Sequence, residues 1–330
     1  MQTFAEMNQE DQLSYVQSLV PLFAREFELD VKEIENVNFA FNASFKVTTT
    51  NGQIYALRIN INSKKHAAEL AAEAAWLQRI EDIDSLQAPV PLKSRSGEYY
   101  AAVWSELLGK ELVCLAYNWI EGTIPGDEPT SEDYRNIGRN MAHLHKSSLD
   151  WLPRGNASMP RLNTTFLTSS SNYPDSRIHP ELARMIDELV IECDKVHERL
   201  SAETTLQPIH ADLHASNVVN QPNGIQAVID FDDCGIGFPL QDFAISSFYL
   251  RNESSFEECV FEGYAEVASV PHFNQQDFEL LIISRQILLL SELLTIETAE
   301  EREFIPKYLE YTEKRIQHFY DTGVFKLIRD

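Results

Sequence analysis

The segment from Ile209 to Asp233, IHADLHASNVVNQPNGIQAVIDFDD, concentrates polar side chains that can do chemistry. Asp212 stands between two histidines, Asn217 follows it five positions later, and Asp230 ends an apolar run. Carboxylate and amide oxygens suit a hard divalent cation such as Mg²⁺, which completes its shell with waters and substrate phosphates. Asn217 and Asp230 are therefore candidate magnesium ligands, and Asp212 is placed to accept the proton of an attacking hydroxyl.

The elements around these residues must bring them to one place. Two short β-rich runs, NVVNQ and IQAVIDF, are joined by PNG and predict a β-hairpin. The loop with Asp212 and Asn217 precedes the first strand, and Asp230 ends the second, so all three can meet at one edge of the hairpin. A base Asp, an Asn and a later strand-end Asp are also the catalytic set of the protein kinases.

The motifs HADLHASN, IDFDD and GFPLQD closely resemble those of the aminoglycoside phosphotransferase and choline kinase superfamily, the small-molecule relatives of protein kinases. YALRI, AEAAWLQRI, YNWIEG and IGRNMAHLHKSS follow in the order of that family's third strand, αC helix, inter-lobe hinge and next helix. Within the superfamily, the chain looks most like a bacterial branch of phosphotransferases, homoserine-kinase-like proteins and stress-response kinases.

The resemblance implies an α+β, two-lobed protein-kinase-like fold. An antiparallel β-sheet with an αC helix would form the nucleotide-binding lobe, residues 1–117, and a mostly helical catalytic and substrate-binding lobe would follow, residues 118–330. ATP would bind between the lobes together with Mg²⁺. The implied roles are Asp212 as catalytic base, Asn217 and Asp230 as metal ligands, Arg58, Glu73, Asn118, Ile120 and Ser44 at the nucleotide, and His210 and Asp242 as supports of the catalytic loop.

Two departures from the kinase pattern affect the nucleotide site. Arg58 stands where protein kinases have a Lys, and the two differ because Arg is a planar, forked donor that keeps its proton. The turn FAFNASFKV contains no glycine, so Asn42 and Ser44 would have to cover the phosphates. No Walker A motif occurs in the chain.

Four functions remain open at this point. The first is ATP- and Mg²⁺-dependent phosphoryl transfer to a hydroxyl of an amino alcohol, amino acid or amino sugar, bound by residues in 153–190 and 250–320. The others are a Ser/Thr protein kinase of the stress-response type, a non-catalytic pseudokinase suggested by Arg58, and a metal-dependent hydrolase built on His210, Asp212 and His214. Asn217 and Asp230 complete an all-oxygen set, which disfavours the hydrolase. Asp232 and Asp233 have no assigned role.

Composition limits the partners. The net charge of −24 repels nucleic acid and anionic membranes and is compatible with a cationic substrate. Glu253, Glu257, Glu258 and Glu262 would either bind an amine or form a solvated helix face. The longest apolar stretch, LLIISRQILLLSELL, is interrupted by Arg285 and Glu292, so no membrane span is predicted.

The cysteines and the first residues bear on location. Cys114, Cys193, Cys234 and Cys259 are widely spaced, and the acidic start MQTFAEMNQEDQL has no signal-peptide pattern, so a cytoplasmic protein is expected. A monomer and a homodimer are both compatible with the sequence.

Periodicity and turn residues predict the elements. Helices are expected over 9–29, 64–81, 131–148, 179–201, 238–249, 254–268 and 274–320. Antiparallel strands are expected over 36–62, with a turn at Asn51-Gly52, and over 98–104 and 110–120. Residues 153–176 are expected to form a loop.

Overall fold

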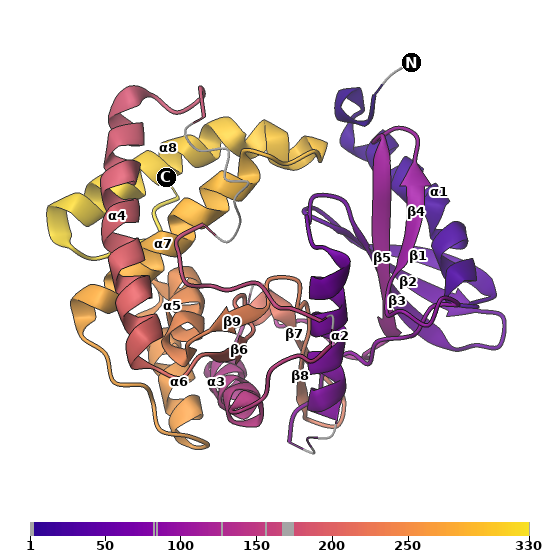
Figure 1. Cartoon of the computed structure of the whole chain (residues 1–330), viewed down its shortest axis with the longest axis horizontal. Helices are drawn as coiled ribbons and strands as arrows, with labels where there is room; N and C mark the ends of the chain where they lie inside the picture. The colour runs from indigo at the N-terminus through magenta and orange to yellow at the C-terminus, as the bar shows by residue number, and fades with distance from the viewer. Residues whose placement is uncertain are drawn as a thin grey trace.

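A five-stranded antiparallel sheet forms the first part of the fold (Figure 1). The computed structural model describes residues 3–81, 83, 85–126, 128–155, 157–166 and 175–329. The strands lie in the order β1-β2-β3-β5-β4. They span Val31–Phe39 (β1), Ala43–Thr49 (β2), Ile54–Asn60 (β3), Ala101–Ser105 (β4) and Lys110–Asn118 (β5), after the short helix η1 (Phe4–Glu6).

Two helices accompany this sheet and belong to different cores. The apolar residues of α1 (Gln9–Glu26) share a core with the strands. Those of α2 (Ala67–Glu81) belong to the larger core of the C-terminal helices. Trp76 anchors α2 there, because its Nε1 donates to Ser148 Oγ at 2.8 Å and its ring meets Phe231 edge-on. The proposed lobe division after residue 117 stays a prediction.

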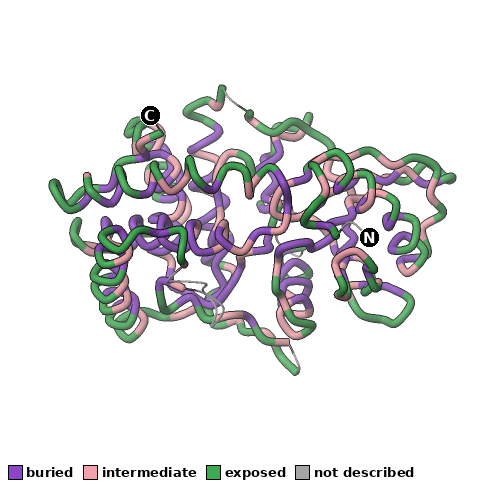
Figure 2. The backbone as a smooth tube through the Cα atoms, turned by 90° about the horizontal axis from the view of Figure 1, so that it is seen from above, coloured by how far each residue is buried: buried purple, intermediate pink, exposed green. Residues whose placement is uncertain are grey.

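The second part of the fold is mostly helical (Figure 1). Its helices are α3 (Ser131–Ser148), α4 (Pro180–Glu203), α5 (Pro239–Leu250), α6 (Ser254–Ala265), α7 (Gln275–Leu293) and α8 (Ala299–Thr322). Two small antiparallel pairs lie between them and the sheet: β6 (Gln207–Ile209) with β9 (Gly235–Gly237), and β7 (Val218–Asn220) with β8 (Gln226–Val228), with the short helix η2 (Ala215–Asn217) before β7. Several of these helices combine buried and exposed residues (Figure 2), whereas most residues of α5 and α7 are buried.

Most of the elements agree with the sequence prediction, and three differ. The region 36–62 holds parts of three strands, and β1 already begins at Val31, because this edge strand is largely exposed and lacks an apolar alternation. The predicted helix 274–320 is two helices. The segment between the two helices, residues 294–298, is fixed by Asn62, whose Oδ1 accepts from Glu297 N at 2.6 Å. β6 and β9 were not predicted, since three residues are too few to show a period.

Other sequence expectations concern loops, cysteines and membrane segments. In the predicted loop 153–176, residues 156 and 167–174 lie outside the described residues, and the remainder forms no helix or extended strand. The four cysteines are buried and unpaired. Across the described residues, none of the helices combines the length and the apolar character that crossing a bilayer requires.

Helices α3 and α6 approach each other closely at two glycines. A Cβ on Gly263 would lie 2.0 Å from Arg135 O, and one on Gly138 would lie 2.1 Å from Val260 O. Gly263→Ala should therefore destabilise the protein by about 1–3 kcal/mol, although Ala is the better helix former. Urea unfolding measures this effect, with the exposed Ser255→Ala on the same helix as control. Equal stability of the two variants would contradict the close packing.

Candidate active site

A buried carboxylate holds the loop that carries Asp212. Asp242, in the first turn of α5, accepts from the backbone N–H of His210 at 3.1 Å and of Ala211 at 2.7 Å, and lies 2.9 Å from His145 Nε2. Ala211 has a φ of 62°, a region that non-glycine residues rarely adopt and that surrounding structure must stabilise. Asp242 provides that stabilisation, as expected for a residue that braces the loop.

His210 connects this loop to the end of β8. Its Nε2 donates to Ile229 O at 3.0 Å, and its Nδ1 accepts from Asp212 N at 3.3 Å. Burial lowers the pKa of His210, which favours the neutral ring that this pair of hydrogen bonds requires. These two contacts tie the loop before β7 to the backbone after β8; the supporting role that the resemblance implies for His210 stays a prediction.

Both carboxylate oxygens of Asp212 have partners. Oδ1 accepts from Arg285 Nη2 at 2.6 Å and from Tyr249 OH at 2.9 Å, and Oδ2 accepts from Asn217 Nδ2 at 3.0 Å. Burial opposes ionisation here, but the positive charge of Arg285 and then that of His214 hold the pKa of Asp212 well below its usual range. Asp212 is therefore a carboxylate near neutral pH.

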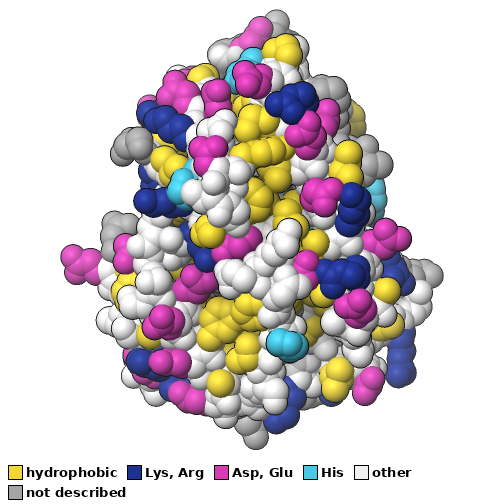
Figure 3. All heavy atoms as spheres, turned by 90° about the vertical axis from the view of Figure 1, so that its left-hand side faces the viewer, with side chains coloured by type: hydrophobic (Ala, Val, Ile, Leu, Met, Phe, Trp, Pro, Cys, Tyr) yellow, Lys and Arg dark blue, Asp and Glu magenta, His cyan; other side chains and the backbone are white. Residues whose placement is uncertain are grey.

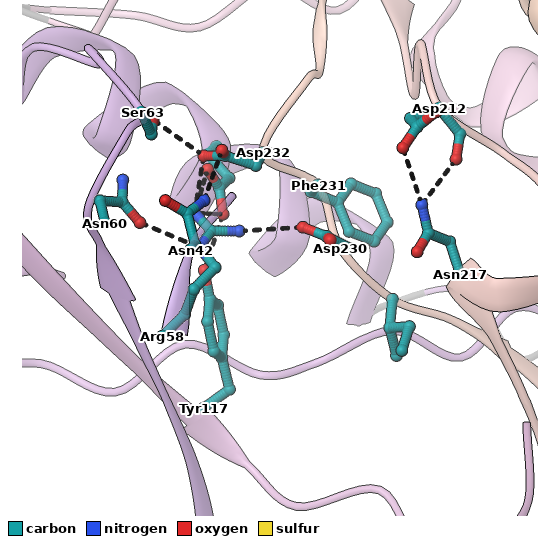
Figure 4. Close-up of polar contacts among 12 residues, drawn as sticks. Asn42, Arg58, Asn60, Ser63, Tyr117, Asp212, Asn217, Asp230, Phe231 and Asp232 are labelled. Carbon is teal, nitrogen blue, oxygen red and sulfur yellow. Dashed lines mark hydrogen bonds and ion pairs between the residues drawn. The ribbon is translucent and has the colours of Figure 1, made fainter. Parts of the chain in front are cut away.

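Asp212 also orients Asn217. Its Nδ2 also donates to Asp212 O at 2.8 Å, which leaves its amide oxygen on the side that faces Asp230 (Figure 4). Asp230 follows β8 with a φ of 61°, another left-handed non-glycine conformation. Its side chain is 48% exposed and lies 3.5 Å from Arg58 Nη1.

These oxygens fit a divalent cation. Desolvation by the surrounding protein atoms, followed by the charges of Asp232 and Asp212, raises the pKa of Asp230 to about 6 despite Arg58, although about half of its side chain still contacts solvent. Such mutual repulsion among carboxylates is the kind that a bound cation relieves. The amide oxygen of Asn217, which has no hydrogen-bond partner among the described residues, is a hard donor of the kind that such a cation binds.

Arg58 and Glu73, which the resemblance places at the nucleotide, form an ion pair. Arg58 Nη2 lies 3.0 and 3.1 Å from the two oxygens of Glu73. The fully buried Glu73 also accepts from Lys65 Nζ at 2.9 Å and from Tyr117 OH at 2.7 Å. Burial would raise the pKa of Glu73, but the charges of Arg58 and Lys65 outweigh it and lower the pKa to about 2.

Asp232 links the sheet to the segment after β8. Its Oδ1 lies 3.2 Å from Arg58 Nη2, and its Oδ2 accepts from Asn42 Nδ2 at 2.9 Å (Figure 4). Asn42 in turn accepts from Ile61 N at 3.1 Å. The turn expected to cover the phosphates is thus tied to Asp232, a residue left unassigned by the sequence.

A cavity of about 530 Å³ adjoins these groups. Among its lining residues are the predicted nucleotide and metal residues Ser44, Arg58, Glu73, Asn118, Ile120, Asn217 and Asp230. The N–H of Asn118 already donates to Val90 O at 3.1 Å, so it is not free for a ligand. The predicted nucleotide residues therefore all line this cavity, but the backbone N–H of Asn118 is not available to bind a nucleotide there.

A smaller cavity of about 120 Å³ lies on the other side of Asp232. Its lining carries both signs of charge: Asp233 and Glu292 lie on it together with Lys64 and Lys65, beside apolar residues such as Pro160. Burial, and then the charge of Asp233, raises the pKa of Glu292 to about 8. This cavity opens beside the segment that carries the candidate metal ligand.

Sequence reasoning missed four residues of the site: Lys65, Tyr249, Arg285 and Glu292. Arg285 and Glu292 were noticed only as interruptions of an apolar run. They are seven positions apart, which is two turns of helix, and so lie on the same face of α7. Two charges on one face, within the apolar stretch LLIISRQILLLSEL of α7, were the available signal.

The acids of α6 do not line either cavity. Glu262 lies 3.0 Å from Arg135 on α3, and Glu257 lies 3.6 Å from Arg251. The two expectations for Glu253, Glu257, Glu258 and Glu262, an amine site or a solvated helix face, both stay predictions. Acidic and basic side chains are likewise interspersed over the face shown in Figure 3.

The histidines do not form a transition-metal site. His214 Nε2 is 3.5 Å from Asp212 Oδ2, and its ring packs on Tyr249 with centroids 4.3 Å apart. Among the described residues, no three His, Cys, Asp or Glu side chains are grouped as metal ligands. The hydrolase alternative, which requires such a group, has no support in this part of the chain.

Comparison with solved structures identifies the fold. An amicoumacin kinase, hAmiN, in complex with AMP-PNP, Ca²⁺ and Ami has a TM-score of 0.71 at 15% identity, covering 93% of this chain and 96% of that one. A microcompartment-associated aminopropanol kinase has a TM-score of 0.67 at 20% identity, covering 96% and 100%. These similarities confirm the predicted kinase-like fold.

Sequence comparison gives the family. A homoserine kinase from Xanthobacter autotrophicus is 26% identical over 213 residues, which are 62% of this chain and 60% of that protein. The match thus spans less than two thirds of this relative. The model of the phosphotransferase enzyme family matches residues 38–269, a range that contains the loop with Asp212, both candidate metal ligands and the Arg58–Glu73 pair. The chain belongs to the phosphotransferase enzyme family.

Proposed function

We propose that this protein transfers the γ-phosphoryl group of ATP, with Mg²⁺, to a hydroxyl of a small molecule that also carries an amine. The observation that carries this proposal is the convergence of the Asp212 carboxylate, the free amide oxygen of Asn217 and Asp230 beside the larger cavity. A base, an oxygen ligand set and a space for a nucleotide are the parts that phosphoryl transfer needs.

The residues would share the work as follows. Asp212 would accept the proton of the attacking hydroxyl, and Arg58, oriented by Glu73, would bind phosphate oxygens. Asn217 and Asp230 would hold Mg²⁺, which when bound neutralises charge on the transferred group. Ser44 and the backbone of Ile120 would contact the nucleotide in the larger cavity.

The smaller cavity would receive the acceptor. Asp233 and Glu292 line it, and burial, followed by the charge of Asp233, raises the pKa of Glu292 to about 8, so the two carboxyl groups disfavour carrying a negative charge together. A substrate ammonium between these two groups would offset their repulsion. A volume of about 120 Å³ suits a small amino alcohol or amino acid better than a large sugar.

The test is product formation from MgATP with paired acceptors. Each hydroxylated amine is compared with its analogue without the amine, and both ADP and the phosphorylated acceptor are measured. We expect Glu292→Gln to raise the KM of the amine at least several-fold with a smaller change for its analogue, whereas the exposed Glu198→Gln changes neither.

Two results would contradict this proposal. Binding of ATP without phosphorylation of any acceptor would favour a pseudokinase. Phosphorylation of a generic protein substrate but of no small molecule would instead favour the Ser/Thr protein kinase alternative.

A further inference from the structure

We propose that Arg285 of α7 is a positioning residue for phosphoryl transfer: one guanidinium fixes the base Asp212 and the acceptor-cavity residue Asp233 relative to each other. This inference rests on the phosphotransferase function proposed above. It adds a residue 73 positions away from the base in sequence, outside the matched family region.

The contacts of Arg285 are directed at both carboxylates. Its Nη2 lies 2.6 Å from Asp212 Oδ1 and 3.1 Å from Asp233 Oδ2, and its Nη1 lies 3.2 Å from the same Asp233 oxygen. Tyr249 closes the arrangement, because its hydroxyl donates to Asp212 Oδ1 at 2.9 Å and accepts from Arg285 Nη2 at 3.4 Å. The orientation of Asp212 is thus set by side chains from two helices.

Arg285 joins two segments that have different tasks. Asp212 belongs to the loop before β7, and Asp233 follows β8 and lines the smaller cavity. A rigid fork that contacts both would keep the base at a constant distance from a hydroxyl bound in that cavity. Lys could not reproduce this, because an ammonium is a point charge on a flexible stem.

Packing alone does not account for an arginine at this position. Its side chain is 3% exposed, and its Nε is buried without a hydrogen-bond partner among the described residues. A buried ion pair is often no better for stability than apolar residues of similar volume. On a helix whose positions next to Arg285 are Ser284 and Gln286, followed on either side by Ile283 and Ile287, a residue kept for stability alone would not need this charge.

The predicted effect is on kcat. Loss of the Arg285 guanidinium should let the Asp212 carboxylate rotate. A misplacement of a catalytic group by about 1 Å can lower the rate about 10²-fold. We expect Arg285→Met to lower kcat by about 10²-fold while the Kd for ATP changes less than about threefold, since Arg285 is not part of the larger cavity. Arg285→Lys should be intermediate.

The experiment measures kcat and KM for the acceptor that the paired panel identifies, together with ATP binding. Arg285→Ala is assayed with and without added guanidinium, which should restore part of kcat only if a missing guanidinium is the defect. Arg315→Met is the matched control: Arg315 is a buried arginine of α8 that donates to Gln286 Oε1 at 2.6 Å and touches neither cavity. It should lose stability without a selective loss of kcat.

The outcomes separate the two proposals. A wild-type protein that phosphorylates no acceptor overturns the proposed function and the role of Arg285 with it. An active wild type whose Arg285→Met variant keeps kcat within twofold overturns the role of Arg285 alone. If Arg285→Met does not fold, Arg285→Lys decides: wild-type kcat in that variant would show that the fork is unnecessary.

Discussion

Asp212→Asn is expected to lower kcat by about 10²- to 10⁴-fold, the usual contribution of a general base. Asn has the shape of Asp and can still accept a hydrogen bond from Arg285, but its amide cannot take the proton of the attacking hydroxyl. The low pKa of Asp212, maintained against burial by the charge of Arg285, means that the base is ionised throughout the physiological range. The loss should therefore be the same at pH 6 and pH 8.

The measurement is acceptor phosphorylation under saturating MgATP, with ATP binding followed separately. ATP affinity should be retained, because Asp212 is not among the residues lining the larger cavity. Asp187→Asn, at an exposed position of α4, is the matched control and should keep full activity. Retention of more than a tenth of the wild-type kcat by Asp212→Asn would remove Asp212 from the role of base.

The sequence was sufficient for the parts of the site that are local. Asp212, Asn217 and Asp230 lie within one hairpin, so their spacing and the turn between the strands predicted that they would meet. The same holds for β3 and α2, which are neighbours in the chain and bring Arg58 to Glu73. In these cases, chain connectivity limits how far apart the side chains can be.

The rest of the site depends on contacts that the sequence does not encode locally. Arg285 reaches Asp212 only because α7 packs against α5, the helix that contributes Tyr249. Asp232 appeared to be half of a solvated turn, yet it pairs with Arg58 and Asn42 from the sheet. Asp232 and Asp233 are adjacent acids that the sequence does not distinguish. The packing of the sheet and the helices determines that Asp232 pairs with Arg58 and Asp233 with Arg285.

Glu73→Ala is expected to destabilise the protein by about 3–5 kcal/mol, the usual effect of removing one partner from a buried ion pair. The substitution removes one of the two carboxylates, Glu73 and Asp232, that the buried cations Arg58 and Lys65 share, and it removes the acceptor of the Tyr117 hydroxyl. Urea unfolding at pH 7 measures the loss. The exposed Glu258→Ala on α6 should lie within about 0.5 kcal/mol of wild type. A Glu73→Ala effect as small as that of Glu258→Ala would mean that the ion pair adds nothing to stability.

Glu73→Gln adds a test that depends on pH. The pKa of Glu73 is lowered from an ordinary value of 4.5 to about 2 in the folded protein, so its ionised form stabilises the fold fully above pH 4.5. That contribution, about 3 kcal/mol at 1.36 kcal/mol per pKa unit, is lost as the pH falls from 4.5 towards 2. Gln cannot titrate, so the stability gap between wild type and Glu73→Gln should be wide at pH 7 and narrow progressively below pH 4.5. A gap that stays constant over this range would show that Glu73 does not carry the charge that orients Arg58.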